Sequence, residues 1–201
     1  MQADKTALIL IGYQYDYFNH DGILSSVIEE SALSTGVLKN SIDLIEKLSS
    51  TAVDMISTPI IFTPDYSEIQ NPSGILQVIK DAKAFQQGSV GSEVIPEILR
   101  FGKRIKEHPG KRGLNAFSNT DVHQYLQENN ITDIILAGVV TSLCIDSTAR
   151  AAYEYGYNIT ILSDCTSGRS DVEQEFYCNN IFPLYSKVID HNQLIKNLKA
   201  S

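Results

Sequence analysis

Cys144 has the residue type and the setting of a reactive nucleophile. A short apolar run, Ile134–Leu136, is typical of a buried strand, and helical spacing begins at Cys144 itself. A cysteine in the first turn of a helix lies beside free backbone N–H groups and the positive end of the helix dipole. Both favour the thiolate, which is the nucleophilic form of the side chain. Many buried cysteines are inert, however, so the surrounding residues must decide whether this one reacts.

Short apolar strands and amphipathic helices alternate along the chain and would have to position this cysteine. Strands are expected at Thr6–Ile11, Thr58–Thr63, Arg104–Pro109, Ile134–Leu136, Asn158–Ser163 and Lys187–Ile189. Helices are expected at Ser31–Ser50, Glu93–Phe101, 119–130, Cys144 onward, Asp171–Asn180 and the C-terminal tail. This rhythm predicts an α/β fold over residues 1–201: one three-layer αβα domain with a mostly parallel, Rossmann-like sheet of about six strands.

The carboxyl ends of the strands are where ligands bind in such folds. Cys144 directly follows a strand, and Gly12–Asp16, Asp65 and Asp164 also come after strands or close to their ends. We therefore expect these residues to gather at one edge of the sheet.

The composition is that of an ordinary globular protein. Hydrophobic residues make up 43% of the 201 residues, and the formal net charge is −8. An acidic chain offers no general surface for nucleic acid or anionic lipid, and no apolar stretch has the length of a membrane span. We see no signal peptide, and three irregularly spaced cysteines fit a reducing cytoplasm, although the sequence leaves a Cys165–Cys178 bridge open.

Four segments, in order, resemble the isochorismatase-like cysteine hydrolases. They are ALILIGYQYDYF (7–18), GSVGSEVIPEI (88–98), HPGKRGLNAF (108–117) and LAGVVTSLCIDSTARAAYEYGYNITILSDC (136–165). The order and spacing of these blocks agree over most of the chain. The resemblance therefore supports the α/β fold and places the nucleophile of that family at Cys144.

The resemblance implies a catalytic triad of aspartate, lysine and cysteine. Cys144 would attack a carbonyl and form a thioester that water hydrolyses, while Lys111 would be the charge partner of the thiolate. The backbone N–H groups of Val140 and Cys144 would form an oxyanion hole, and the bond between Val139 and Val140 would be cis. No cofactor is implied.

Gly12 stands where the family has its catalytic aspartate. General acid–base help is typically worth 10²- to 10⁴-fold, so its loss alone predicts a slow enzyme. One interpretation is that another carboxylate substitutes, with Asp16 the nearest in sequence and Asp164 a weaker candidate. Alternatively, the substrate needs no aspartate. In a third interpretation the site binds a small molecule without turnover.

Several other side chains are candidates for contacting a substrate. Tyr13 and Tyr17 flank the gap at Gly12, and Arg112 and Asp65 could also line the pocket. Arg169 could bind a substrate carboxylate. We expect Cys165 to be structural, and Glu173 and Glu175 to form a solvated helix face.

No metal site is expected from the histidines. His20, His108, His123 and His191 are scattered without ligand spacing. Nicotinamidase-like members of the family carry an aspartate and several histidines after the second strand, whereas residues 63–74 contain Asp65 and no histidine. This difference also counts against nicotinamide as the substrate.

These features together predict a cysteine-dependent hydrolase of a small polar molecule that cleaves a C–N, amide-type bond. The alternative is a catalytically impaired or non-catalytic member of the family that binds or senses a small molecule. In either case we expect a cytoplasmic homo-oligomer, a dimer or larger, with no nucleic-acid or membrane partner.

Overall fold

The computed structural model describes residues 1–199 and contains a six-stranded sheet in which every pair of neighbours is parallel. In the order β3–β2–β1–β4–β5–β6, the strands are Lys106–Glu107, Asp54–Ser57, Thr6–Ile11, Asp133–Val139, Asn158–Ser167 and Lys187–Ile189. The predicted α/β architecture is thereby confirmed.

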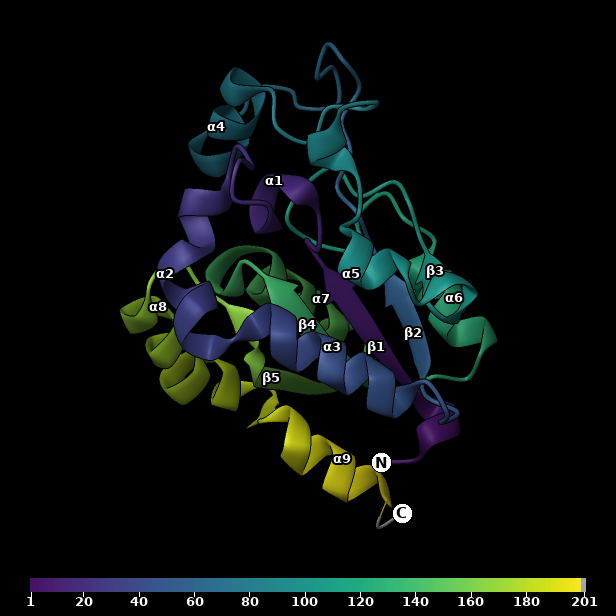
Figure 1. Ribbon diagram of the computed structural model, residues 1–201. Helices are drawn as coiled ribbons and strands as arrows, with labels where there is room; N and C mark the ends of the chain where they lie inside the picture. The colour runs from purple at the N-terminus through teal and green to yellow at the C-terminus, as the bar shows by residue number, and fades with distance from the viewer. Residues whose placement is uncertain (200–201) are drawn as a thin grey trace.

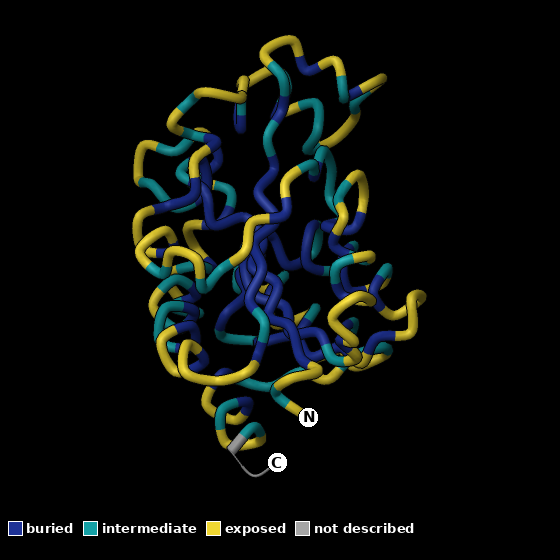
Figure 2. The backbone as a smooth tube through the Cα atoms, turned by 90° about the vertical axis from the view of Figure 1, so that its right-hand side faces the viewer, coloured by how far each residue is buried: buried dark blue, intermediate teal, exposed yellow. Residues whose placement is uncertain are grey.

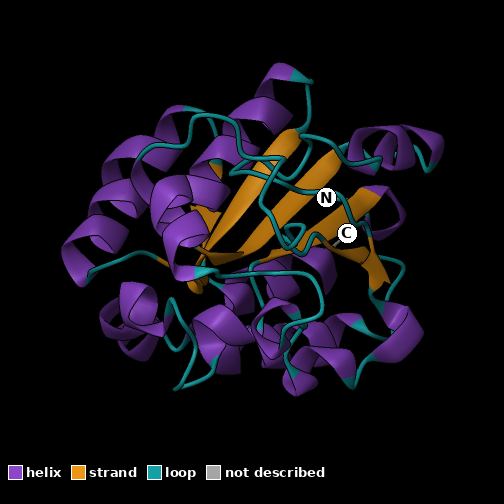
Figure 3. Ribbon diagram, turned by 90° about the horizontal axis from the view of Figure 1, so that it is seen from above, coloured by secondary structure: helices purple, strands orange, loops and turns teal. Residues whose placement is uncertain are grey.

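Helices connect the strands and cover both faces of the sheet (Figure 3). They are α1 Tyr15–Phe18, α2 Ser25–Thr35, α3 Val37–Leu48, α4 Gly74–Ala82, α5 Pro96–Leu99, α6 Val122–Glu128, α7 Asp146–Glu154, α8 Asp171–Phe176 and α9 His191–Lys199. Two π-helical turns, η4 (Thr141–Ile145) and η5 (Tyr177–Ile181), precede α7 and follow α8. Short 3-10 turns are η1 Ala3–Lys5, η2 Val90–Ser92, η3 Gly102–Arg104 and η6 Phe182–Leu184.

The central strand β1 is buried along its whole length because both of its faces are covered. Side chains alternate across a strand, so Ala7, Ile9 and Ile11 pack with α6 and α7, whereas Leu8 and Leu10 pack with α3, α5 and α9. A strand buried on both faces reads as a continuous apolar run, which is why β1 was predicted with its observed bounds.

A third apolar cluster covers the carboxyl ends of the strands. This cap cluster combines side chains of α1, α2 and the segment 58–92 with Val139 and Val140: Tyr17, Leu24, Ile28, Ile60, Phe62, Tyr66, Ile69, Ile79, Ala84 and Phe85. In Figure 1 the segment with α4 forms the top of the molecule, above α1. Figure 2 shows the buried backbone in the centre under this more exposed cap. The cap encloses the edge at which the candidate site was expected.

The single helix predicted for Ser31–Ser50 is wrong, because the chain forms two helices there. Gly36 separates α2 from α3 with φ +65°, a left-handed conformation that glycine adopts readily. Asn40 donates to the carbonyl of Thr35 across this break at 2.8 Å.

The second strand lies earlier than predicted, at Asp54–Ser57 and not at Thr58–Thr63. The N–H of Thr58 still donates to the carbonyl of Leu10 at 3.1 Å, but Pro59 has no N–H with which to continue the ladder. The chain then leaves the sheet and enters the cap. No helix within residues 1–199 combines the length and the apolar character needed to cross a membrane.

Candidate active site

Cys144 lies in a tight turn between β4 and α7. The bond between Val139 and Val140 is cis, and the π-helical turn η4 follows at once. The α-helix begins only at Asp146, so the prediction that Cys144 occupies its first turn is wrong by a few residues. The side chain is 6% exposed and packs against the face of the sheet covered by α7.

Lys111 is the charged group in contact with the Cys144 thiol. Its Nζ lies 3.6 Å from Sγ and also donates to the carbonyl of Gly113. The lysine is 1% exposed, although its own chain segment is a loop. Burying an ammonium group is costly unless it has partners of opposite polarity, and a thiolate at Cys144 would supply one. The geometry therefore suits a thiolate–ammonium pair.

A small, largely enclosed cavity of about 10 Å³ adjoins this pair. Its size corresponds to about one water molecule. The lining is mainly aliphatic, and its polar or ionisable side chains are Tyr17, Thr58, Lys111 and Cys144. The remaining lining residues are Ile11, Gly12, Ile60, Ile75, Ile79, Leu114, Val139 and Leu143.

Gly12 borders the cavity with a backbone that leaves no room for a side chain. Its φ is +78°, and a Cβ atom there would lie 2.8 Å from Cγ2 and 2.9 Å from the carbonyl oxygen of Val139. A carboxylate therefore cannot be placed at this position without moving the strand end. This backbone conformation thus has no room for the aspartate that the family resemblance implied at this position.

Asp16 does not reach the cavity, which is contrary to its candidacy as the substitute base. It is 3% exposed, and its two carboxylate oxygens accept the N–H groups of Ile23, at 3.3 Å, and Phe85, at 2.6 Å. A Cβ at Gly91 would lie within 2.6 Å of the same carboxylate. Asp16 thus ties α1 to the cap segment, which explains its burial without a catalytic role.

The two tyrosines beside Gly12 separate in the structure. Tyr17 lines the cavity, whereas Tyr13 packs on the α3 side of the sheet and shares a 2.5 Å hydrogen bond with Ser41. Burial raises the pKa of Tyr17 well above its usual range, and the charges of Cys144 and Asp16 raise it further. The phenol of Tyr17 therefore stays protonated at neutral pH.

Arg112 and Asp65 lie outside the cavity. Arg112 pairs with Glu68 at 3.1 Å, and Asp65 is exposed in the cap, where it accepts hydrogen bonds from Thr63 and Ser67. Neither residue is among those that line the cavity. Arg169 likewise pairs with a carboxylate, that of Glu173, at 2.6 Å.

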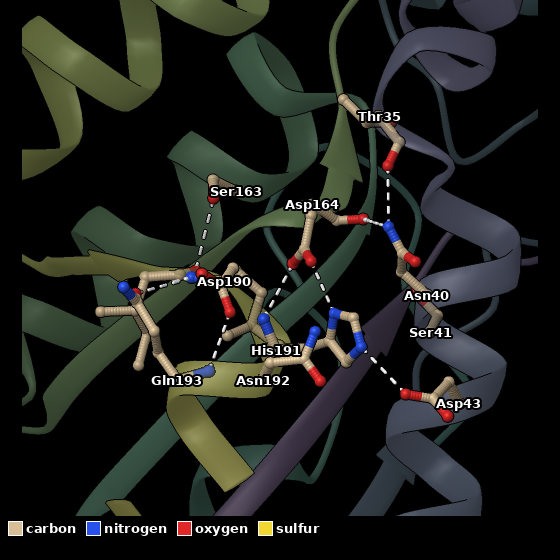
Figure 4. Close-up of polar contacts among 12 residues, drawn as sticks. Thr35, Asn40, Ser41, Asp43, Ser163, Asp164, Asp190, His191, Asn192 and Gln193 are labelled. Atoms are coloured by element: carbon tan, nitrogen blue, oxygen red, sulfur yellow. Dashed lines mark hydrogen bonds and ion pairs between the residues drawn. The ribbon is translucent and has the colours of Figure 1, made fainter. Parts of the chain in front are cut away.

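Asp164, the weaker candidate base, belongs to a structural clamp at the start of α9. His191 lies between two carboxylates, with Nδ1 2.5 Å from Asp164 and Nε2 2.9 Å from Asp43 (Figure 4). Asp164 also accepts the backbone N–H of His191 at 2.9 Å. The clamp joins α3, β5 and α9, and its hydrogen bonds occupy both nitrogens of the imidazole.

The cysteines other than Cys144 are structural thiols. All three are free, so Cys165 and Cys178 do not form a bridge. Burial raises the pKa of Cys165, with a further rise from Asp164, and burial raises the pKa of Cys178 to about 11. Within residues 1–199, one cluster of His, Cys or carboxylate side chains is close enough together to hold a metal ion. It consists of Asp164, Cys165 and His191, whose possible ligand atoms all lie within 4.8 Å of one another. The hydrogen bonds of the clamp already explain this grouping.

Glu173 was predicted to be solvated, but it supports the turn η4, which carries Cys144. It accepts a hydrogen bond from Ser142 at 2.6 Å and pairs with Arg169, while the next residue, Gln174, accepts one from Thr141 at 2.6 Å. Burial raises the pKa of Glu173, but the hydrogen bonds from Ser142 and Arg169 outweigh it, so the pKa is lowered overall. This role is visible only in the folded structure, where α8 lies beside η4.

Thr58 was not singled out from the sequence and is the most unusual polar residue of the cavity. It is 1% exposed, and its Oγ1 is the one buried side-chain nitrogen or oxygen within residues 1–199 that has no hydrogen-bond partner. Nothing in the local sequence signals this, because the lack of a partner depends on how β1, β2 and the cap come together.

Comparisons with known proteins agree with the fold. The family model described as "Isochorismatase domain" matches residues 6–193. Nicotinamidase 3 of Arabidopsis thaliana is 24% identical over 194 residues, covering 96% of this chain and 89% of that protein. A cysteine hydrolase from Pseudomonas syringae pv. phaseolicola 1448A has a TM-score of 0.88 at 18% identity, covering 100% of this chain and 95% of its own. N-carbamoylsarcosine amidase from Thermoplasma acidophilum has a TM-score of 0.74 at 20% identity, covering 94% and 97%.

Proposed function

The chain belongs to the isochorismatase family, and we propose that it hydrolyses a C–N, amide-type bond in a small molecule through a thioester on Cys144. The observation that carries the proposal is the 3.6 Å contact between Lys111 Nζ and Cys144 Sγ beside an enclosed cavity. The nicotinamidase and the amidase among its relatives support the choice of bond.

Lys111 would carry the proton that the missing aspartate cannot. The Cys144 thiolate attacks the carbonyl carbon, the C–N bond breaks, and the leaving nitrogen takes a proton from Lys111 Nζ. Water then attacks the thioester and gives its proton to the neutral amine of Lys111, after which the C–S bond breaks and the acid leaves. The N–H groups of Val140 and Cys144 would hold the oxyanion at each attack.

The substrate would combine an amide with a small aliphatic body. Isoleucine, leucine and valine side chains dominate the cavity lining, and Lys111 is the cation there. Such a wall favours an apolar group on the small polar molecule expected from the sequence. The arginines that could bind a carboxylate lie elsewhere and are paired, so a neutral substrate fits best.

The second candidate function is binding without turnover. Its support is specific: among the described residues no carboxylate lines the cavity. The backbone at Gly12 also leaves no room for a side chain that could supply one. A protein of this kind would hold an aliphatic amide and release it unchanged.

A panel of small aliphatic amides separates the two functions. We expect amine or ammonia release by the wild type, none by Cys144→Ala, and a loss of about 10²- to 10⁴-fold in Lys111→Met, because the proton carrier is removed. Ligand-induced stabilisation without product release would instead support the binding function. Size-exclusion chromatography of the same samples tests the predicted homo-oligomer.

A further inference from the structure

Thr58 holds a hydroxyl group that the folded protein leaves unsatisfied. Its Oγ1 is buried without a hydrogen-bond partner among the protein groups that the structure describes, and a hydroxyl left unpaired carries an uncompensated desolvation cost. Nearly all buried polar groups of native proteins are satisfied, so each exception asks for an explanation. A group outside the protein is one partner that would remove the penalty.

The backbone fixes where this hydroxyl lies. Thr58 follows β2, and its N–H donates to the carbonyl of Leu10 in β1 at 3.1 Å. Because β2, β1 and β4 are neighbours in the sheet, Thr58, Gly12 and Val139 meet at one edge. Thr58 and Cys144 line the same cavity, although 86 positions separate them in the chain numbering.

The other polar or ionisable side chains that line the cavity with Thr58 are Tyr17, Lys111 and Cys144. Gly12 has no side chain and no space for one, and Ile60 is apolar. Lys111 Nζ is already committed to the Gly113 carbonyl and the Cys144 thiol. A polar substrate atom that enters the cavity therefore comes close to Thr58, whose hydroxyl has no partner within the protein.

We propose that Thr58 Oγ1 hydrogen-bonds the amide group at the scissile bond of the substrate and so positions it against Cys144. The inference rests on the proposed hydrolase function and assigns a substrate-binding residue to it. A hydroxyl both donates and accepts, so Thr58 can serve a carbonyl oxygen or a leaving N–H. The substrate class follows: neutral aliphatic amides, with alkyl analogues that lack the amide bound more weakly, because the hydroxyl then stays unpaired.

The test uses two thiol reagents that differ in one respect. Iodoacetamide carries an amide next to the reacting carbon, whereas methyl methanethiosulfonate delivers a methylthio group without one. Site-resolved mass spectrometry follows the labelling of Cys144 in the wild type, in Thr58→Val, which keeps the shape and loses the hydroxyl, and in Thr58→Ser, which keeps the hydroxyl. We expect Thr58→Val to slow iodoacetamide about 2- to 10-fold, the range of one hydrogen bond, and Thr58→Ser to retain the wild-type rate. The rate with methyl methanethiosulfonate should stay within about 2-fold of wild type in both variants, because the methylthio group has no amide with which Thr58 could form a hydrogen bond.

Thermal unfolding without any ligand distinguishes a substrate-binding hydroxyl from a structural one, because the two predict opposite changes of Tm in Thr58→Val. Because Oγ1 has no partner in the folded protein, Thr58→Val should raise Tm by about 2–4 °C. A fall of several degrees would mean that the hydroxyl supports the fold, and it would overturn the inference.

The labelling outcomes separate this inference from the proposed function. Unchanged iodoacetamide rates in Thr58→Val, or equal slowing by both reagents, would overturn the role of Thr58 while leaving the nucleophile intact. Failure of both reagents to label Cys144 in the wild type would contradict the proposed function, and the inference with it.

Discussion

Gly12 occupies a backbone position that fits only a residue without a side chain. Its φ of +78° lies in the region that glycine adopts freely, and a Cβ would come within 3 Å of two atoms of Val139. A carboxylate therefore cannot be introduced at position 12 without a shift of the backbone, and Lys111 is the charged side chain in contact with Cys144.

Gly12→Asp is expected to destabilise the protein and not to increase hydrolysis. The strained φ and the contact with Val139 together should cost about 2–4 kcal/mol, which lowers Tm by at least about 4 °C. Gly12→Ala is the matched control, and a similar fall there would assign the cost to the backbone and the Cβ. A Gly12→Asp protein with wild-type Tm and faster amide hydrolysis would contradict this interpretation.

Residue type and position singled out Cys144, the family resemblance pointed to Lys111, and the structure brings the two into contact. Residue type and position were not enough for Asp16 or Thr58. The role of Asp16 depends on the N–H of Phe85, which reaches it only after the cap segment folds back. Thr58 is notable for a hydrogen bond that it does not make, and no sequence pattern encodes that.

At the scale of elements, α8 holds the turn that carries Cys144. Glu173 and Gln174 accept hydrogen bonds from Ser142 and Thr141 of η4, both at 2.6 Å. Cys144 lies two residues after Ser142 in the same turn, so the position of its thiol depends on α8 as well as on β4.

Glu173→Gln should therefore lower the stability of the fold at neutral pH. It should also make that stability less sensitive to a fall of pH in the acid range. The pKa of Glu173 in the folded protein is lower than its ordinary value near 4.5. The contribution of its carboxylate to the stability of the fold is therefore fully present above pH 4.5. The contribution is lost as pH falls through the lowered folded pKa. We expect a loss of about 1–3 kcal/mol at pH 7 and a shallower fall of Tm between about pH 5 and 3.

Glu175→Gln on the same helix is the control, because Glu175 is exposed and should leave Tm and its pH dependence unchanged. Equal effects of the two substitutions would show that Glu173 does not hold the turn.

The elements that sequence could predict are those whose signal is local. Strands β1 and β6 match their expected bounds because short apolar runs define them. The break at Gly36 was missed because helical apolar spacing continues across it, although φ there is +65°. The strand β2 was placed too late because Ile60 and Phe62 look like strand residues but pack in the cap cluster.

At the scale of the whole molecule, the cap cluster closes the active edge of the sheet. The cavity beside Cys144 holds about 10 Å³, which is less than any amide substrate needs. Ile75 and Ile79 of α4 form part of its wall, and Figure 1 shows α4 at the top of the cap. Substrate entry therefore requires the cap to move away from the sheet, and closure afterwards would exclude bulk water from the thioester.

The acyl-enzyme itself is the most direct test of the central claim that Cys144 is the nucleophile. The wild type is mixed with isobutyramide, quenched in acid and digested for mass spectrometry, with Cys144→Ala as the control. We predict an isobutyryl group on Cys144 that hydroxylamine removes, and neither adduct nor product with Cys144→Ala. Product release by Cys144→Ala, or an acyl group on a different residue, would contradict the claim.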